Sequence, residues 1–225
     1  DALHGGFVVQ RFWHHSKLEL VRTLGLPDSS MTVLDLGCGS GVVAHLLAQN
    51  AGKVYAIDGN QAAIEFAQSQ FKLPNLEFRH GLLHELELPG NSFDAIYLLE
   101  VVEHLYEQQA CELLKSLKIL LKPSGRLIIT TPDYHSFWPV VEWLMDTLHL
   151  APKMMEHQHV FKVTRPGLFR LARESGYAVT QCLRESGLAP FCSVLGWRFA
   201  EIIRRLERKL GGPFGMLICA ELKIS

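Results

Sequence analysis

The chain has 225 residues, of which 48% are hydrophobic and 20% are charged, and its formal net charge is −1. This composition is typical of a globular protein with a full hydrophobic core, and the near-zero charge gives no electrostatic reason to expect a nucleic acid as partner. No apolar run reaches the roughly 18 residues that a membrane-spanning helix needs. Five scattered cysteines, without a Cys-x-x-Cys pair, favour reduced thiols in a cytoplasmic protein.

The first part of the chain alternates between strand and helix patterns. Apolar residues recur at helical spacing over 7–24, and Gly25 and Pro27 end that helix. After it, the patterns predict strands at 32–36, 53–57, 75–79, 93–99 and 126–130 and helices at 42–49, 61–70 and 106–121. This alternation predicts parallel strands with helices on both faces of the sheet, which is a three-layer α/β sandwich.

Two insertions interrupt the alternation in the second part of the chain. The first, 133–163, is rich in aromatic residues and histidine and has helical spacing over 137–148, and the second, 186–212, carries another helix. A helix at about 165–175 and strands at about 177–183 and 215–223 complete the predicted elements. We therefore expect residues 1–225 to form a single domain. The first insertion is interpreted as a lid over a hydrophobic acceptor, as a helix packed on the sheet edge, or as a contact with a membrane surface.

Residues 33–41, Val-Leu-Asp-Leu-Gly-Cys-Gly-Ser-Gly, have the pattern of a strand, a tight turn and a helix start. The glycines suit a turn with unusual backbone angles that must come close to a bound molecule. Asp58 ends the next strand, where a carboxylate can accept hydrogen bonds from both hydroxyls of a ribose. The third glycine comes one residue earlier than in the dinucleotide pattern, and Asp35 would repel a pyrophosphate but attract a cationic ligand. These features favour S-adenosylmethionine over NAD.

On these residues, the chain resembles the class I S-adenosylmethionine-dependent methyltransferases, and within them the small-molecule branch that includes the ubiquinone-biosynthesis type. Residues 33–41 match the first motif of that family, and Asp58 matches its ribose-binding acid. Residues 91–96 and 120–127 match the segments before its fourth and fifth strands. The resemblance implies a Rossmann-like seven-stranded sheet in the order 3-2-1-4-5-7-6, with the seventh strand antiparallel, and S-adenosylmethionine as cofactor.

Members of this family often have an Asp after the third strand that bonds the adenine amino group. Here Leu82 holds that position, so we expect backbone groups and apolar contact from Leu82 and Leu83 to hold the adenine instead. The predicted cofactor-binding residues are Asp35, Gly37, Cys38, Gly39, Gly41, Asp58, Gly59, Leu82, Leu83 and Glu100.

The next cluster of chemically active residues is Glu100-Val101-Val102-Glu103-His104, directly after the fourth strand. Two carboxylates and an imidazole suit a divalent metal ion, and this Glu-x-x-Glu-His pattern is similar to that of ubiquinone-pathway O-methyltransferases and small-RNA 2′-O-methyltransferases. A Glu-His pair is also common in the small-molecule branch without a metal, and we favour this metal-free site. His159, in the first insertion, is expected to act as general base beside the acceptor. The predicted catalytic residues are therefore His104, His159 and Glu103, with no metal ligand.

The sequence thus predicts methyl transfer to a small apolar or aromatic acceptor, on oxygen. One alternative is a metal-dependent RNA 2′-O-methyltransferase, and another is a protein that binds the cofactor without catalysis. The helix in the second insertion has Phe199, Ile202, Leu206 and Leu210 on one side and basic residues around the rest. Contact with a membrane surface or RNA is one interpretation of that helix, and an ordinary solvated face is the favoured one. The sequence makes no prediction of oligomeric state.

Overall fold

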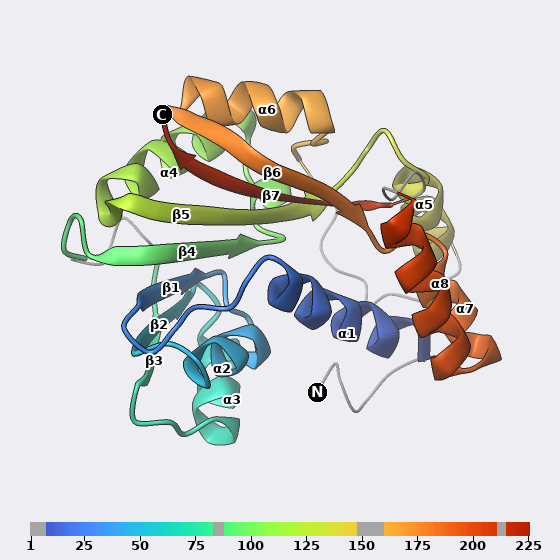
Figure 1. The fold of residues 1–225 in the computed structure, drawn as a ribbon, viewed down its shortest axis with the longest axis horizontal. Helices are drawn as coiled ribbons and strands as arrows, with labels where there is room; N and C mark the ends of the chain where they lie inside the picture. Colours follow the sequence, from blue (N-terminus) through green and yellow to red (C-terminus); the bar gives the residue numbers. More distant parts are fainter. Residues whose placement is uncertain (1–7, 83–87, 148–159, 211–214) are drawn as a thin grey trace.

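The computed structural model describes residues 8–82, 88–147, 160–210 and 215–225. Its centre is a seven-stranded sheet in the order β3-β2-β1-β4-β5-β7-β6 (Figure 1), which confirms the predicted strand order. β7 pairs antiparallel with both β5 and β6, while the pairs among β1 to β5 are parallel. The strands are β1 (Thr32–Leu36), β2 (Lys53–Asp58), β3 (Leu76–His80), β4 (Phe93–Leu99), β5 (Leu121–Pro132), β6 (Tyr177–Glu185) and β7 (Leu217–Ile224).

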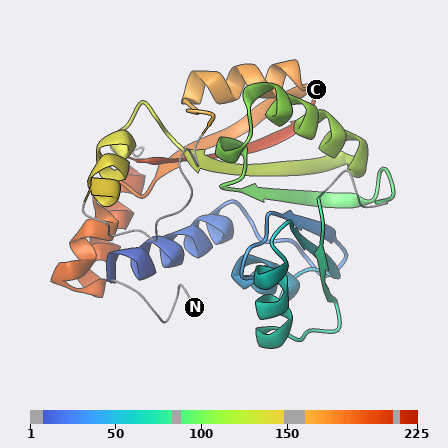
Figure 2. The ribbon, with the colours of Figure 1, turned by 180° about the vertical axis from the view of Figure 1, so that it is seen from behind.

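Helices cover both faces of the sheet, as the alternation of patterns predicts (Figures 1 and 2). Successive side chains of a strand point to opposite faces, so Val33 and Leu34 of β1 belong to different halves of the core. Val33 shares its half with residues of three helices, α1 (Val8–Thr23), α2 (Val42–Ala48) and α3 (Gln61–Gln70). Leu34 shares the other half with residues of α4 (Glu107–Leu120) and α6 (Arg165–Glu174).

β5 begins earlier than the sequence predicts. The Pro123-Ser124-Gly125 segment has the composition of a turn, so the strand was expected to start at Arg126. In the structure Leu121 already pairs with Phe93 of β4, and the register shifts before Ala95 pairs with Arg126. A bulge of this kind lets strand pairing continue across extra residues, which is why turn-forming residues here do not end the strand.

The two insertions provide further helices at the end of the molecule where the parallel strands finish (Figure 1). α5 (Trp138–Thr147) comes from the first insertion, and α7 (Ala189–Cys192), the 3-10 turn η3 (Ser193–Leu195) and α8 (Trp197–Lys209) come from the second. Phe12 of α1 packs against Ala189 and Ala200, and its ring lies 5.0 Å from that of Trp197. α1 therefore joins the second insertion to the main fold.

α8 is fixed by arginines that point into the protein. Arg204 is only 4% exposed, and its guanidinium lies 2.6 Å from Glu201 Oε1 and 3.8 Å from Glu185 Oε2 at the end of β6. Arg208 donates to Glu185 through Nε and to Thr23 of α1 through Nη1, the latter over 2.7 Å. Since Glu185 is also buried, its charge depends on these two arginines.

We expect Arg204→Ala to lower the free energy of unfolding by about 2–3 kcal/mol, because it leaves buried carboxylates with less compensation. Arg205→Ala is the matched control: this neighbour also bonds to Glu201, but its side chain is 73% exposed. We expect that change to cost less than about 1 kcal/mol. Urea unfolding of both variants measures the difference, and equal losses would show that the inward arginine does not anchor α8.

Candidate functional site

The turn between β1 and α2 is packed on two sides and open on a third. Gly37, Gly39 and Gly41 have φ values of 78°, 50° and 80°, which L side chains rarely adopt. A Cβ on Gly37 would lie 2.4 Å from Val101 Cγ2, and one on Gly41 would lie 2.7 Å from Phe78 Cε1. A Cβ on Gly39 would meet nothing within 4 Å. A ligand can therefore approach the backbone of the turn at Gly39.

Asp58, at the end of β2, holds this turn in place. Its Oδ2 accepts a hydrogen bond from Gly39 N over 2.7 Å, and its Oδ1 accepts one from Asn60 N over 2.8 Å. Asn60 in turn caps α3, because its Oδ1 accepts from Ala62 N. A carboxylate has about four acceptor positions, so both oxygens of Asp58 can still accept bonds from ligand hydroxyls.

Asp35 of β1 is an almost fully buried carboxyl beneath the same turn. Burial, and secondly the negative charge of Asp58, raise the pKa of Asp35 to about 7. Its Oδ2 has no hydrogen-bond partner among the described residues. A cationic ligand group would offset both the burial and the repulsion, so this carboxyl suits a positively charged ligand.

The two remaining predictions near this turn concern Cys38 and Leu82. Burial, with the nearby charges of Asp35 and Asp58, raises the pKa of the Cys38 thiol, so it stays neutral and serves as a small packed residue. Leu82 lies beside Gly59, where an added Cβ would be 3.0 Å from Leu82 Cδ2. An apolar side chain therefore flanks the backbone next to Asp58. The predicted residue Leu83 lies outside the described residues.

A second group of site residues follows β4, which is the neighbour of β1 in the sheet. Glu100 has a φ of 56°, a left-handed conformation that is strained for a residue with a side chain. Its backbone N donates to Thr130 O over 2.9 Å, which holds it in this conformation. Its Oε2 accepts from Lys17 Nζ of α1 over 2.5 Å. Contact between Val101 and Gly37 brings this group against the glycine turn.

Glu103 and His104 lie on the 3-10 turn η2 (Val102–His104), which immediately follows this strained residue. Glu103 is almost fully buried, and burial, with the charge of Glu100 as the second cause, raises the pKa of its carboxyl to about 8. Its backbone O accepts from Phe161 N over 3.1 Å, which places the end of the first insertion against η2. His104 is exposed on the same turn. The site therefore contains one buried carboxyl with an unusually high pKa and one exposed imidazole.

The structure adds two residues that the sequence did not assign to the site, both on α1. Lys17 reaches Glu100, 83 positions away in the chain. Burial, and secondly the charge of Lys17, lower the pKa of His14 to about 4, while Glu100 opposes that shift. The sequence predicts the helix that carries them, at 7–24, but no motif marks either side chain.

The predicted base His159 lies outside the described residues, so its place relative to Glu103 and His104 stays a prediction. Among residues 8–82, 88–147, 160–210 and 215–225, no group of three or more His, Cys, Asp or Glu side chains is arranged to hold a metal ion.

Comparisons with known proteins agree with this site. A family profile described as a methyltransferase domain matches residues 9–182. A probable S-adenosylmethionine-dependent methyltransferase of Mycolicibacterium smegmatis is 28% identical over 144 residues, covering 64% of this chain and 54% of the relative. The mitochondrial ubiquinone biosynthesis O-methyltransferase of Schizosaccharomyces pombe is 35% identical over 108 residues, covering 46% of this chain and 38% of that protein. The chain thus spans about half or less of the length of these relatives.

Solved structures with this fold include two methyltransferases. The S-adenosylmethionine-dependent methyltransferase of Mesorhizobium loti has a TM-score of 0.66 and 18% identity, covering 92% of this chain and 97% of that one. The magnesium protoporphyrin IX methyltransferase of Synechocystis PCC 6803, solved with bound SAH, has a TM-score of 0.65 and 20% identity, covering 100% and 91%. At these identities, the likeness shows the shared fold.

Asp35→Asn is expected to stabilise the empty protein while weakening cofactor binding. The pKa of Asp35 is about 7 in the folded protein and 3.8 in the unfolded chain. Because the unfolded chain ionises first, the free energy of unfolding of the wild type falls as the pH rises from about 4 to about 7. The variant avoids this loss, so its free energy of unfolding should exceed that of the wild type by on the order of 3 kcal/mol at pH 8 and by much less at pH 4. Urea unfolding at the two pH values, with S-adenosylmethionine titration at pH 8, measures both effects. An equally tight cofactor complex in the variant would contradict this role.

The glycines offer a second test. Gly39→Ala should still fold, because its Cβ meets open space and the positive φ costs only about 1–2 kcal/mol. It should weaken S-adenosylmethionine binding more than about tenfold, because the side chain occupies the ligand approach. Gly37→Ala should instead lower the melting temperature, because its Cβ would overlap Val101. Thermal unfolding and calorimetry separate the two effects. If both variants only lost stability, the open side at Gly39 would not be the ligand approach.

Proposed function

The chain belongs to the methyltransferase-domain family of S-adenosylmethionine-dependent enzymes, and on this premise we propose that it methylates an oxygen atom of a small apolar or aromatic acceptor. The described residues fit the cofactor: Asp58 can accept from ribose hydroxyls, Gly39 leaves open space, and Asp35 has an oxygen without a partner among them. When bound, S-adenosylmethionine supplies a methyl group on a positively charged sulfur.

The observation that carries the oxygen acceptor is the raised pKa of Glu103. A hydroxyl must lose its proton as its oxygen attacks the methyl carbon, and a positioned base with a pKa near the working pH removes that proton most effectively. An ordinary glutamate, with a pKa of 4.5, is a weak base, whereas burial and Glu100 bring the pKa of Glu103 to about 8. Glu103 then takes the hydroxyl proton onto its carboxylate. His104 is the second candidate for this role on the same turn.

The aromatic residues near the first insertion support an apolar or aromatic acceptor. Trp138 of α5 packs against Trp13 of α1, with ring centroids 5.5 Å apart. Phe137, Val140 and Trp143 expose apolar side chains around the same helix. α1 also carries Lys17, which bonds to Glu100, so these rings are attached to a helix that borders the site. Aromatic walls of this kind bind planar apolar ligands and exclude water.

The relationship to the ubiquinone biosynthesis O-methyltransferase of S. pombe supports the same acceptor class. That name describes methyl transfer to oxygen in the synthesis of ubiquinone. We extend that acceptor class to this chain as part of the proposal.

Glu103→Gln should lower turnover at least about 100-fold while leaving S-adenosylmethionine affinity within about threefold, because the base acts on the acceptor and not on the cofactor. Glutamine resembles the protonated carboxyl, so we expect the variant to fold. Wild-type kcat/KM should rise with pH through about 8 as Glu103 of the free enzyme loses its proton, and the variant should lose this rise. The assay measures transfer of labelled methyl groups to a panel of phenols.

Glu107→Gln is the control, because Glu107 is an exposed glutamate on α4 that pairs with Arg170. It should retain wild-type turnover and pH dependence. The same panel includes matched anilines, thiols and short RNAs. Transfer to anilines or RNA but not to phenols, or full activity of Glu103→Gln, would contradict the proposed oxygen acceptor.

A further inference from the structure

α8 is oriented opposite to what its amphipathic sequence suggests. In a globular protein the apolar side of such a helix usually faces the core and the charged side faces water. Here Arg204 faces the interior, in contact with Glu185 and Glu201, together with the small residue Ala200. Ile202 and Leu206 are 55% and 49% exposed. Trp197 and Ile203 pack toward Phe12, but the other large apolar side chains of the helix face outward.

These outward residues form a continuous row, which we name the apolar stripe: Phe199, Ile202, Leu206 and Leu210. Their spacing of three, four and four residues places them along one side of α8. All four are exposed, and so are Val194 and Leu195 of η3, which leads into the helix. An exposed surface of this size, made of large apolar side chains on adjoining elements, marks a contact site.

A second row lies beside the apolar stripe, and we name it the basic stripe: Arg198, Arg205 and Lys209. Its members are separated by seven and four residues and are all exposed. The acidic side chains of α8 already have partners within the chain. Glu201 accepts hydrogen bonds from Arg204 and Arg205 of the same helix, and Glu207 accepts one from Leu188 N. Among the described residues, no ion pair involves Arg198 or Lys209. The outer face of α8 is therefore apolar on one side and cationic on the other.

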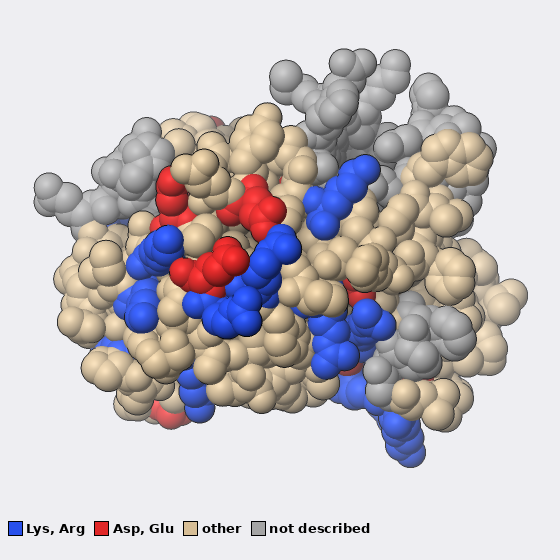
Figure 3. All heavy atoms as spheres, turned by 90° about the horizontal axis from the view of Figure 1, so that it is seen from above, with Lys and Arg blue, Asp and Glu red and all other residues tan. Residues whose placement is uncertain are grey.

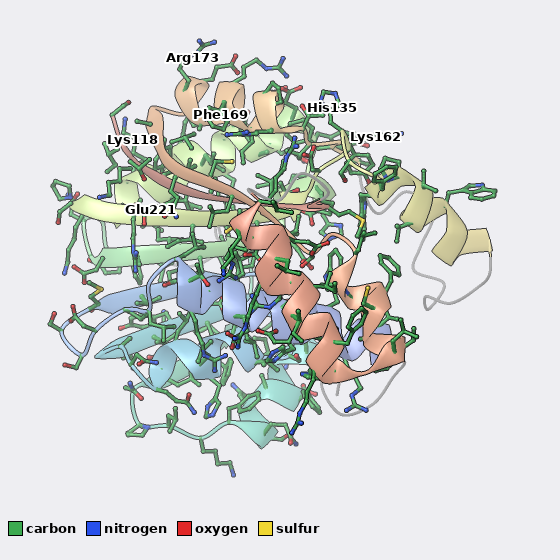
Figure 4. All side chains as sticks on the ribbon, turned by 45° about the vertical axis from the view of Figure 1, so that its right-hand side comes forward. Lys118, His135, Lys162, Phe169, Arg173 and Glu221 are labelled. Atoms are coloured by element: carbon green, nitrogen blue, oxygen red, sulfur yellow. The ribbon has the colours of Figure 1, made fainter. Side chains whose placement is uncertain are left out.

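The views of the whole molecule agree with this arrangement. Figure 4 shows α8 on the outside of the molecule in front of α1. In Figure 3, acidic and basic residues gather together over the left-hand part of the view, and fewer charged residues show over the right-hand part.

We propose that the outer face of η3 and α8 docks on the surface of an anionic lipid bilayer. The apolar stripe would enter the boundary between headgroups and acyl chains, and the basic stripe would meet lipid phosphates. No helix among the described residues is long and apolar enough to cross a bilayer. The charges favour lipid over a second copy of this chain, because two such faces would bring Arg198 and Lys209 of both copies together, while Glu201 and Glu207 already bond within the chain.

Docking at this face also brings the bilayer near the proposed site, through α1. Phe12 of α1 packs against Ala189 of α7 and Ala200 of α8, and Lys17, five positions later, bonds to Glu100. Five residues of helix span about 7.5 Å, so one short stretch of α1 contacts both features. This consequence rests on the proposed function: an apolar acceptor dissolved in the bilayer would be available beside the site.

Sedimentation with vesicles tests the docking directly. The wild-type protein should bind phosphatidylcholine vesicles that contain phosphatidylglycerol much more tightly than vesicles of phosphatidylcholine alone, and added salt should weaken that binding. Ile202→Ser combined with Leu206→Ser should reduce binding more than about tenfold. Arg198→Gln and Lys209→Gln should each reduce it about fivefold on the anionic vesicles only. Ile119→Ser is the control, because Ile119 is an equally exposed apolar residue on α4, away from this face.

The proposal is overturned if the wild-type protein does not bind anionic vesicles, or if the double serine variant binds them as well as the control does. A second result would also overturn it: the wild-type protein is a dimer in sedimentation velocity and does not bind vesicles, and the double serine variant is a monomer. The face would then be a contact between copies of this chain. Methyl transfer to a soluble phenol without vesicles is measured on the same variants and should not change. If the protein binds anionic vesicles but does not methylate phenols, the proposed acceptor is wrong and the docking surface still stands.

Discussion

The hydrogen bond between the Asp58 carboxylate and Gly39 N is the contact on which the site depends. It joins the end of β2 to the turn that follows β1, and the second oxygen of Asp58 fixes the start of α3 through Asn60 N. Ile57, one residue earlier, accepts bonds from Gly37 N and Cys38 N. The conformation of the turn is therefore set by the neighbouring strand, and the ligand meets a surface that is already formed.

Around this turn, the protein keeps buried acids whose charges are poorly compensated. Burial raises the pKa of both Asp35 and Glu103, and each has a second carboxylate nearby. Such groups cost stability in the empty protein, and Glu100 adds backbone strain beside them. The two acids serve different partners in our account. Asp35 faces a cationic cofactor, whereas Glu103 takes a proton from the acceptor. In this account, the two carboxyls that destabilise the empty protein are the ones that bind the cofactor and accept the proton.

Local patterns of apolar residues, glycines and acids predicted the α/β sandwich and the glycine turn, whereas the strand order followed from the resemblance to the class I methyltransferases. The sequence could not predict which way α8 faces, since periodicity shows which residues share a side but not what covers that side. It also missed Lys17 and His14, whose roles arise from the packing of α1 against residues far away in the chain. The strain at Glu100 depends on its bond to Thr130 O, which is likewise a tertiary contact.

Calorimetric titration of the wild-type protein and of Asp58→Asn with S-adenosylmethionine, and separately with NAD, tests this account most directly. We expect saturable binding of S-adenosylmethionine to the wild-type protein, no binding of NAD, and at least about tenfold weaker S-adenosylmethionine binding in the variant, because the amide no longer supplies a charged acceptor to the ribose hydroxyls and the turn. Binding of NAD in place of S-adenosylmethionine, or undiminished affinity in a folded Asp58→Asn variant, would contradict the central role of this carboxylate.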